Sequence, residues 1–153
     1  MRLVCDEMLK RLGQWLRVAG HDVLIPPDGM DDAAILAWAA GEKRPLLTRD
    51  RELAQRRSDT PVILLQCKDL DDCAVAVGRR LPIDWLYDPF SRCLFCNTPL
   101  QPADEQVLHR VPDDAAQRAT RVRYCPTCDR VYWDGSHVQR MHERLLRWNA
   151  ASH

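Results

Sequence analysis

Two Cys-x-x-Cys motifs in the last third of the chain constrain its fold more than any other feature. Cys93 and Cys96 form the first motif, and Cys125 and Cys128 form the second. Each motif presents two thiolates on one turn, at a spacing that suits tetrahedral zinc. A redox pair or unrelated free thiols are the alternatives, but a thioredoxin-like motif follows a strand and opens a helix, which Cys93 does not. We therefore predict a closed, structural zinc site.

The segment around these cysteines is too small to bury much apolar surface, so zinc is expected to supply much of its stability. The 28 residues at positions 97–124, between Cys96 and Cys125, exceed the usual spacing of a zinc finger. We expect either a long hairpin or a hairpin that carries an insert, in which 107–108 can pair with 122–124. A strand over 131–133 and an amphipathic helix to about residue 148 are expected to follow.

The first half of the chain alternates short apolar runs with helical patterns. Strands are predicted over 3–5, 22–25, 45–48 and 62–65, and helices over 8–19, 31–41, 50–57 and 70–80. Short connections between alternating strands and helices build βαβ units with a mainly parallel sheet. The predicted fold class is therefore α/β, with a three-layer α/β/α domain over residues 1–81, a linker over 82–91, and a zinc ribbon with a C-terminal helix over 92–153.

Acidic residues stand where three of the predicted helices begin. Asp6 follows the first strand, Asp31 and Asp32 open the second helix, and Asp50 follows the third strand. The ligand site of a parallel sheet lies beyond the carboxyl ends of its strands, so Asp6 and Asp50 are expected side by side. Converging carboxylates repel one another and favour a hard cation such as Mg²⁺ or Mn²⁺. Each acid alone is equally well explained as a helix N-cap.

Composition excludes some classes of protein and leaves others open. The formal net charge is zero, which argues against a simple electrostatic nucleic-acid binder. No run approaches the roughly 18 apolar residues of a membrane span, and acids near the N-terminus break any secretory signal, so a cytoplasmic protein is expected. The predominance of Arg over Lys suits phosphate recognition or merely reflects a GC-rich genome. Cys5, Cys67 and Cys73 are expected to be free thiols packed in the core.

Several motifs together resemble the Mut7-C RNase domain family. In the first half these are Asp6-x-Met8-Leu9, Leu12-x-x-Trp15-Leu16-Arg17-x-x-Gly20-x-Asp22 and Leu46-Leu47-Thr48-Arg49-Asp50-Arg51-x-Leu53. In the second half they are Arg92-Cys93-Leu94-x-Cys96-Asn97-x-x-Leu100, Cys125-x-x-Cys128, Tyr132-Trp133-x-Gly135-Ser136-His137 and Arg140-Met141. The resemblance covers nearly the whole chain, with both halves in order.

The resemblance implies a PIN-like nuclease fold in which clustered acids bind Mg²⁺ or Mn²⁺ and cleave RNA. The positions that match the family's acids are Asp6, Asp50 and Asp32, with Asp31 a less favoured substitute for the last. Thr48 stands where a hydroxyl positions the metal or an acid. For a fourth acid the nearest match is Glu52, which is equally explained as an ion-pair partner of Arg49 or Arg51. Glu7 ranks below it.

The same resemblance suggests that the zinc ribbon and its tail hold the substrate. Aromatic rings there can stack on unpaired bases and guanidinium groups can contact phosphates. The predicted RNA-binding residues are Arg49, Arg121, Arg123, Arg130, Tyr132, Trp133, His137 and Arg140. Core packing is the alternative for one of the two aromatic residues, and capping of the last helix is the alternative for His137.

Three functions follow from these observations. The leading hypothesis is a metal-dependent ribonuclease with a structural Zn²⁺ and a catalytic Mg²⁺ or Mn²⁺, and with RNA as its partner. The second is a non-catalytic RNA- or ribosome-associated adaptor, and the third is a protein-interaction module that binds a partner through the ribbon. Ionised acids around a metal distinguish the first, and steep salt dependence separates the second from the third.

Overall fold

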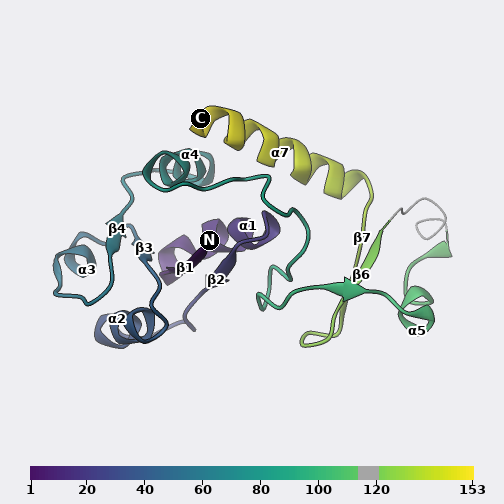
Figure 1. Cartoon of the computed structure of the whole chain (residues 1–153), viewed down its shortest axis with the longest axis horizontal. Coiled ribbons are helices and arrows are strands. Elements are labelled where there is room, and N and C mark those ends of the chain that lie inside the picture. The colour runs from purple at the N-terminus through teal and green to yellow at the C-terminus, as the bar shows by residue number, and fades with distance from the viewer. Residues whose placement is uncertain (114–120) are drawn as a thin grey trace.

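A four-stranded parallel sheet forms the centre of the first half in the computed structural model, which describes residues 1–113 and 121–153 (Figure 1). Its strands are β1 (Arg2–Cys5), β2 (Asp22–Leu24), β3 (Leu46–Thr48) and β4 (Val62–Leu64), in the order β2-β1-β3-β4. All three neighbouring pairs are parallel. The predicted α/β class and the parallel sheet are confirmed, and β1 and β3 are direct neighbours.

The helices lie between the strands as expected. They are the 3₁₀ turn η1 (Glu7–Leu9), α1 (Lys10–Val18), α2 (Asp32–Gly41), α3 (Arg51–Gln55) and α4 (Leu70–Arg80). Gly20 ends the first helical segment with a φ of 101°, a conformation that only glycine adopts without strain. The N-caps of η1, α2 and α3 are Asp6, Asp31 and Asp50, so the capping explanation of these acids holds locally.

Two hydrophobic clusters fill the two faces of the parallel sheet. Because successive side chains of a strand point to opposite faces, β1 supplies Leu3 and Cys5 to one cluster and Val4 to the other. Strand β3 divides in the same way, with Leu47 in the first cluster and Leu46 in the second. Helices α1 and α4 cover the first face, and α2 and α3 cover the second.

The C-terminal helix α7 (Ser136–Ser152) returns to the first half of the molecule and lies beside α4 (Figure 1). Its Leu145 and Trp148 are buried in the larger cluster. The segment over 82–91 adds Ile83 and Trp85, both fully buried, to the same cluster. The predicted domain boundaries at residues 81 and 91 stay a prediction. The buried contacts of 82–91 and of α7 with the larger cluster join the segments on either side of these boundaries.

A three-stranded antiparallel sheet forms the second half, made of β5 (Gln101–Pro102), β6 (Val122–Cys125) and β7 (Arg130–Trp133). The expected pairing of 107–108 with 122–124 is wrong, because β5 pairs with β6 instead. Residues 107–108 belong to the short helix α5 (Glu105–Leu108). The reason is a cap: the carboxylate of Asp104 accepts a hydrogen bond from the Val107 backbone N–H, which stabilises a helical turn.

The prediction of three free core cysteines is wrong for two of them. Cys67 and Cys73 form a disulfide, with their Cα atoms 5.0 Å apart. The short turn from β4 into α4 brings them together, and this separation lies within the range that a disulfide spans. Cys5 is free and fully buried, as expected.

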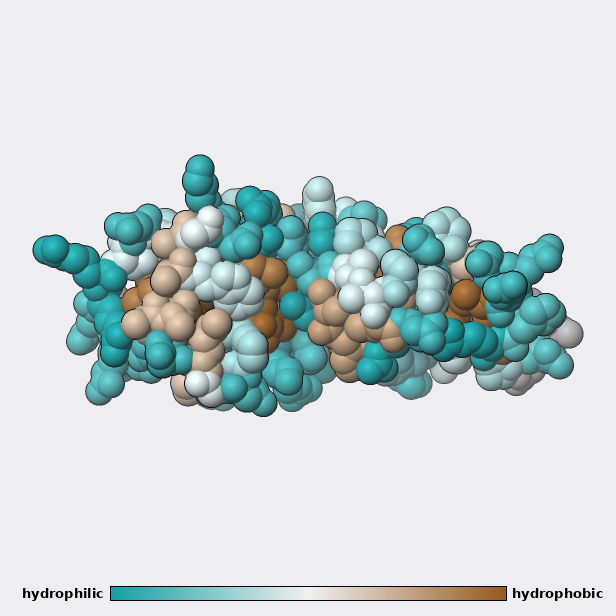
Figure 2. Space-filling model, turned by 90° about the horizontal axis from the view of Figure 1, so that it is seen from below, coloured by the Kyte–Doolittle hydropathy of each residue, from teal (hydrophilic) through white to brown (hydrophobic). Residues whose placement is uncertain are grey.

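The surface of one face is shown in Figure 2, where the molecule is elongated and hydrophobic side chains form separate patches among hydrophilic ones. Within residues 1–113 and 121–153, no helix has the length and apolar character needed to cross a membrane.

Candidate functional site

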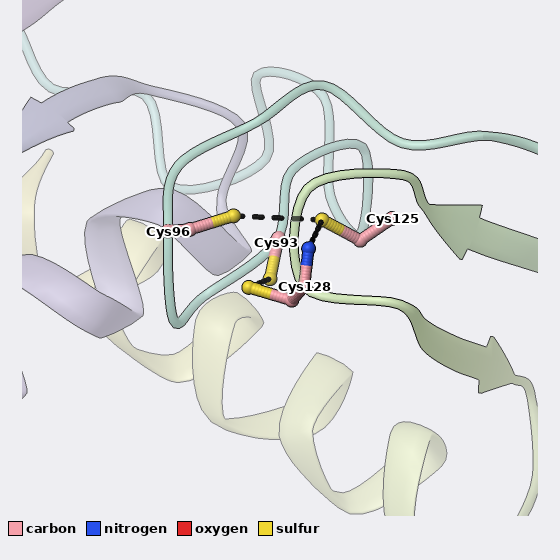
Figure 3. Close-up of side chains that lie close together, drawn as sticks. All are labelled: Cys93, Cys96, Cys125 and Cys128. Atoms are coloured by element: carbon pink, nitrogen blue, oxygen red, sulfur yellow. Dashed lines mark hydrogen bonds between the residues drawn. The ribbon is translucent and has the colours of Figure 1, made fainter.

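The four motif cysteines converge from two turns that lie far apart in the sequence (Figure 3). All four Sγ atoms lie within 4.8 Å of one another. The Sγ–Sγ distance is 3.9 Å between Cys93 and Cys128, and 3.4 Å between Cys96 and Cys125. Tetrahedral zinc with Zn–S bonds of about 2.3 Å places its sulfur atoms roughly 3.8 Å apart. The cluster is therefore compatible with a structural zinc ion that leaves no position open.

Each cysteine turn ends on a residue with positive φ. Asn97 follows the first motif at 72°, and Asp129 follows the second at 55°. Asn and Asp adopt this left-handed conformation more readily than other non-glycine residues. It turns the chain back toward the cluster, where the Cys128 backbone N–H lies 3.4 Å from the Cys125 Sγ atom. The two turns are thus built alike.

The thiols of Cys96 and Cys128 have different pKa values. Burial acts to raise the pKa of Cys96, but hydrogen bonds with Thr98 and with neighbouring thiols lower it to about 6. The hydrogen bond with Cys96, followed by burial, raises the pKa of Cys128 to about 12. Only ionised thiolates bind zinc, so metal binding at neutral pH releases protons from this cluster.

The first cysteine turn is docked on the outer edge of the parallel sheet. The Asn97 side-chain oxygen accepts a hydrogen bond from the Val23 backbone N–H at 3.0 Å, and its amide nitrogen donates to the Asp22 carboxylate at 2.6 Å. Arg17, which is buried, donates from Nε to the Val23 carbonyl and from Nη1 to the Leu94 carbonyl. These bonds satisfy the exposed edge of β2 and fix the cysteine cluster relative to the sheet.

A second group of polar residues lies where β1 and β3 end. Asp6 is 4% exposed, and the Thr48 hydroxyl donates a hydrogen bond to its carboxylate. The same hydroxyl accepts a hydrogen bond from the Asp50 backbone N–H at 2.9 Å. Asp50 also caps α3, through hydrogen bonds from the backbone N–H groups of Glu52 and Leu53. The structure thus places Asp6, Thr48 and Asp50 together at the carboxyl edge of two neighbouring strands.

Electrostatics at this edge favour a cation. Burial raises the pKa of Asp6, hydrogen bonds from Thr48 and Leu9 lower it in part, and the charge of Asp50 raises it again. Among the described residues no Lys, Arg or His forms an ion pair with Asp6 or Asp50, whereas Asp22, for example, is paired with Arg44. A buried carboxylate beside a second carboxylate, without a basic partner, is the arrangement that a divalent cation neutralises.

The other predicted acids have different surroundings. Asp31 is exposed and caps α2, and Asp32 is half-buried in the first turn of that helix. Glu52 is exposed, and the Glu7 carboxylate accepts a hydrogen bond from the Gly29 backbone N–H. Within the described part of the chain, the cysteines alone form a group of three or more ligating side chains within 4.8 Å. A role for these outer acids stays a prediction.

Five of the predicted RNA-binding residues line one cavity of about 550 Å³, between the second sheet and the start of α7. They are Arg121, Arg123, Tyr132, Trp133 and His137. Of the remaining three, Arg49 flanks Asp50, Arg140 is exposed on α7, and the guanidinium of Arg130 lies 3.8 Å from the centre of the Phe95 ring. The capping alternative for His137 is wrong, because Gly135 is the N-cap of α7.

Some features near these sites were not predicted from the sequence. Asp69 follows β4, the strand next to β3, and it caps α4. Its place after a strand and before a helix is the same signal that identified Asp50. Tyr132 was expected to face RNA or the core, but its hydroxyl lies 3.0 Å from the Cys93 Sγ atom. No sequence pattern reveals that contact, since it depends on the register of β7.

One known protein family matches nearly the whole chain. The family model described as Mut7-C RNAse domain matches residues 1–145 of the 153-residue chain. Searches of curated proteins and of solved structures each gave no match. The matched range contains both cysteine turns and all the acids at the sheet edge. Because the match spans almost the entire chain, the protein belongs to the Mut7-C RNAse domain family.

Proposed function

We propose that this protein is a PIN-type ribonuclease that depends on Mg²⁺ or Mn²⁺ and hydrolyses phosphodiester bonds in RNA. One observation carries the proposal: Asp6 is buried, lacks a basic partner among the described residues, and lies beside Asp50 at the ends of adjacent parallel strands. Membership of an RNase family supports RNA as the substrate. Structural caps alone do not explain the burial of Asp6.

The oxygen ligands at this edge suit a hard divalent cation. Asp6 and Asp50 would hold it, and Asp32, at the start of α2, is the third acid proposed to serve there. Such an ion supplies positive charge to the scissile phosphate and activates water for attack on phosphorus. Thr48 keeps the Asp6 carboxylate in a fixed orientation through its hydrogen bond. Hydrolysis of this kind leaves a 3′-hydroxyl and a 5′-phosphate.

The cysteine module, defined here as residues 92–113 and 121–135, is proposed to hold a structural Zn²⁺ as a zinc ribbon and to assist RNA binding. Support for zinc comes from the convergence of the four Sγ atoms. Support for RNA binding comes from the arginine and aromatic residues that meet at its cavity. A protein partner that binds the module is the competing proposal.

Cleavage assays test the catalytic proposal directly. Zinc-loaded protein, stripped of other metals, is incubated with single-stranded and structured RNA, with and without Mg²⁺ or Mn²⁺. Asp6→Asn and Asp50→Asn are compared with Asp104→Asn, which makes the same change at the N-cap of α5, away from the sheet edge. Asparagine also caps helices, so the folds of these variants are expected to survive.

We expect metal-dependent cleavage that falls at least about 100-fold in Asp6→Asn and Asp50→Asn and is unchanged in Asp104→Asn. Products that end in a 2′,3′-cyclic phosphate would contradict the proposed chemistry. RNA binding without cleavage in any protein would favour the adaptor, and its affinity would fall steeply with added salt.

A further inference from the structure

The cavity beside the cysteine module is lined by residues from several parts of the chain. They come from the end of α1, from the segment after α4, from strands β6 and β7, and from the first turns of α7. Its floor is apolar and includes Phe90, Leu94, Leu100, Val138 and Met141. A volume of about 550 Å³ falls within the roughly 300–1,000 Å³ of sites that bind small organic groups.

Positive charge surrounds this apolar floor. Arg92, Arg121 and Arg123 line the cavity, and His137 lies at the start of α7. Arg92 is fixed in place, since it donates to the Gly20 and Asn97 carbonyls. Among the described residues, Asp134 is the one acid of the lining, and it accepts a hydrogen bond from the Arg121 backbone N–H. Three guanidinium groups against one carboxylate favour an anionic ligand with an apolar part.

The aromatic residues of the lining differ in what they leave open. The Tyr132 hydroxyl is occupied by its contact with the Cys93 Sγ atom, which fixes that ring as part of the wall. Trp133 also lines the cavity and is 37% exposed. Aromatic rings stack on any nucleobase, and guanidinium groups bind phosphate. The apolar floor, the partly exposed Trp133 and the arginine residues of the lining together match the parts of one nucleotide.

We propose that this cavity binds a single unpaired nucleotide of the RNA, with the base over the apolar floor and its phosphates at Arg121 and Arg123. The inference rests on the proposed function and adds to it a second contact point on the substrate, away from the acids at the sheet edge. Because only an unstacked base can enter, the protein prefers RNA with a single-stranded stretch to a continuous duplex.

A fluorescent base tests the entry of the nucleotide. The probe is an RNA hairpin with a single-stranded tail that carries 2-aminopurine, and the protein carries Asp50→Asn so that the probe stays intact. Val138→Trp fills the cavity, and Gln139→Trp adds the same side chain at an exposed position one residue later. Zinc content and far-UV circular dichroism verify that both variants are folded.

We expect the emission of 2-aminopurine to change on binding to the Asp50→Asn protein and to its Gln139→Trp derivative. Val138→Trp is expected to abolish the change and to weaken binding about 5- to 100-fold, the range found when one base–aromatic contact is lost. Equal affinity and equal emission changes in the two tryptophan variants would overturn the inference.

The arginine contacts are tested by salt dependence. Arg121→Gln and Arg123→Gln are each expected to reduce the slope of log K against log salt concentration by about 0.7, the value for one phosphate of single-stranded RNA. Arg147→Gln, at the far end of α7, is the control and leaves the slope unchanged. Unaltered slopes in all three variants would overturn the assignment of the phosphates.

These outcomes separate the inference from the proposed function. Cleavage by the wild-type protein together with full RNA affinity in the cavity variants would overturn the inference alone. Absence of both cleavage and binding in the wild-type protein would overturn the proposed function, and the nucleotide site with it. Loss of cleavage but not of RNA binding in Asp50→Asn, together with weakened binding in Val138→Trp, would support both.

Discussion

The parallel sheet and the cysteine module differ in what fills their interiors. The sheet lies between two hydrophobic clusters, and side chains such as Leu3, Leu46 and Leu47 are completely buried there. In the described part of the module the buried residues are Cys93, Cys125, Val107 and Val111. The first region is thus stabilised by apolar burial, whereas the second is expected to depend on the proposed zinc ion.

This difference decides how each region responds to substitution and to metal removal. It also explains why two different sequence patterns identified the two regions. Hydrophobic periodicity identified the sheet, and ligand spacing identified the module. Helix α7 connects the two, since it starts beside the module and ends against α4 (Figure 1).

The largest expected effect comes from removing the metal. Zinc binding at a four-cysteine site contributes on the order of 10 kcal/mol of folding free energy, so Cys128→Ser or strong chelation should unfold the module and leave the sheet intact. Hydrogen exchange read by mass spectrometry is expected to show lost protection over 92–113 and 121–135 and unchanged protection over β1–β4. Thr127→Ser is the control, and it retains zinc. Equal protection with and without metal would contradict the comparison.

The next effect concerns the helix that joins the regions. Trp148 is 3% exposed, packs against the rings of Trp15 and Trp85, and donates from Nε1 to the Asp71 carboxylate at 2.8 Å. Trp148→Ala is expected to lower the free energy of unfolding by about 3–5 kcal/mol in urea denaturation, because it empties a core position.

Leu146 is two residues away on the same helix and 44% exposed, so Leu146→Ala should change the free energy of unfolding by less than about 0.5 kcal/mol. Equal effects of the two substitutions would show that α7 does not depend on the core of the sheet region.

The packing of α7 also marks the limit of sequence analysis. The mainly parallel sheet, the helix positions and the adjacency of β1 and β3 followed from local patterns, because short connections leave few topologies for a parallel sheet. The return of α7 did not, because an amphipathic stripe does not specify its partner. The Asp71–Trp148 hydrogen bond joins residues 77 positions apart, and no local signal encodes it.

Two smaller errors had local causes. Val107 favours a strand by its branched side chain, but Asp104 three residues earlier is a helix-capping signal that decided the outcome. The Cys67–Cys73 disulfide depends on the close approach of α4 to the end of β4, whereas an apolar context suggested two unpaired thiols. In both cases a nearby partner outweighed the intrinsic preference of the residue.

A moderate effect is expected where the 82–91 segment crosses the end of α1. At Gly20, with a φ of 101°, an added Cβ atom would lie 2.5 Å from the Asp88 carbonyl oxygen. Gly20→Ala should cost about 2–3 kcal/mol, from backbone strain and from displacement of residues 88–90. Gly29 also has positive φ, at 84°, but nothing lies within 4 Å of its added Cβ.

Gly29→Ala therefore isolates the backbone strain, at about 1 kcal/mol, and thermal unfolding of both variants measures the difference. Identical losses of stability would mean that Asp88 moves freely and that the segment is not held against α1.

The smallest effect is a pH dependence at the contact between α7 and α4. The hydrogen bond from Trp148 Nε1, followed by those from Arg144, lowers the pKa of Asp71. A carboxyl group with a lowered folded-state pKa adds stability above its unfolded value, near 3.9, and this stability is lost as the pH falls through the folded-state pKa. Because Asp71 is 61% exposed, the contribution should stay below about 1 kcal/mol.

Asp71→Asn is therefore expected to remove a small part of the acid sensitivity of unfolding below pH 4, whereas Asp28→Asn, in an exposed loop, leaves it unchanged. An NMR titration that places the folded-state pKa of Asp71 at or above 3.9 would contradict this assignment and leave Trp148 packing as the main link between the two regions.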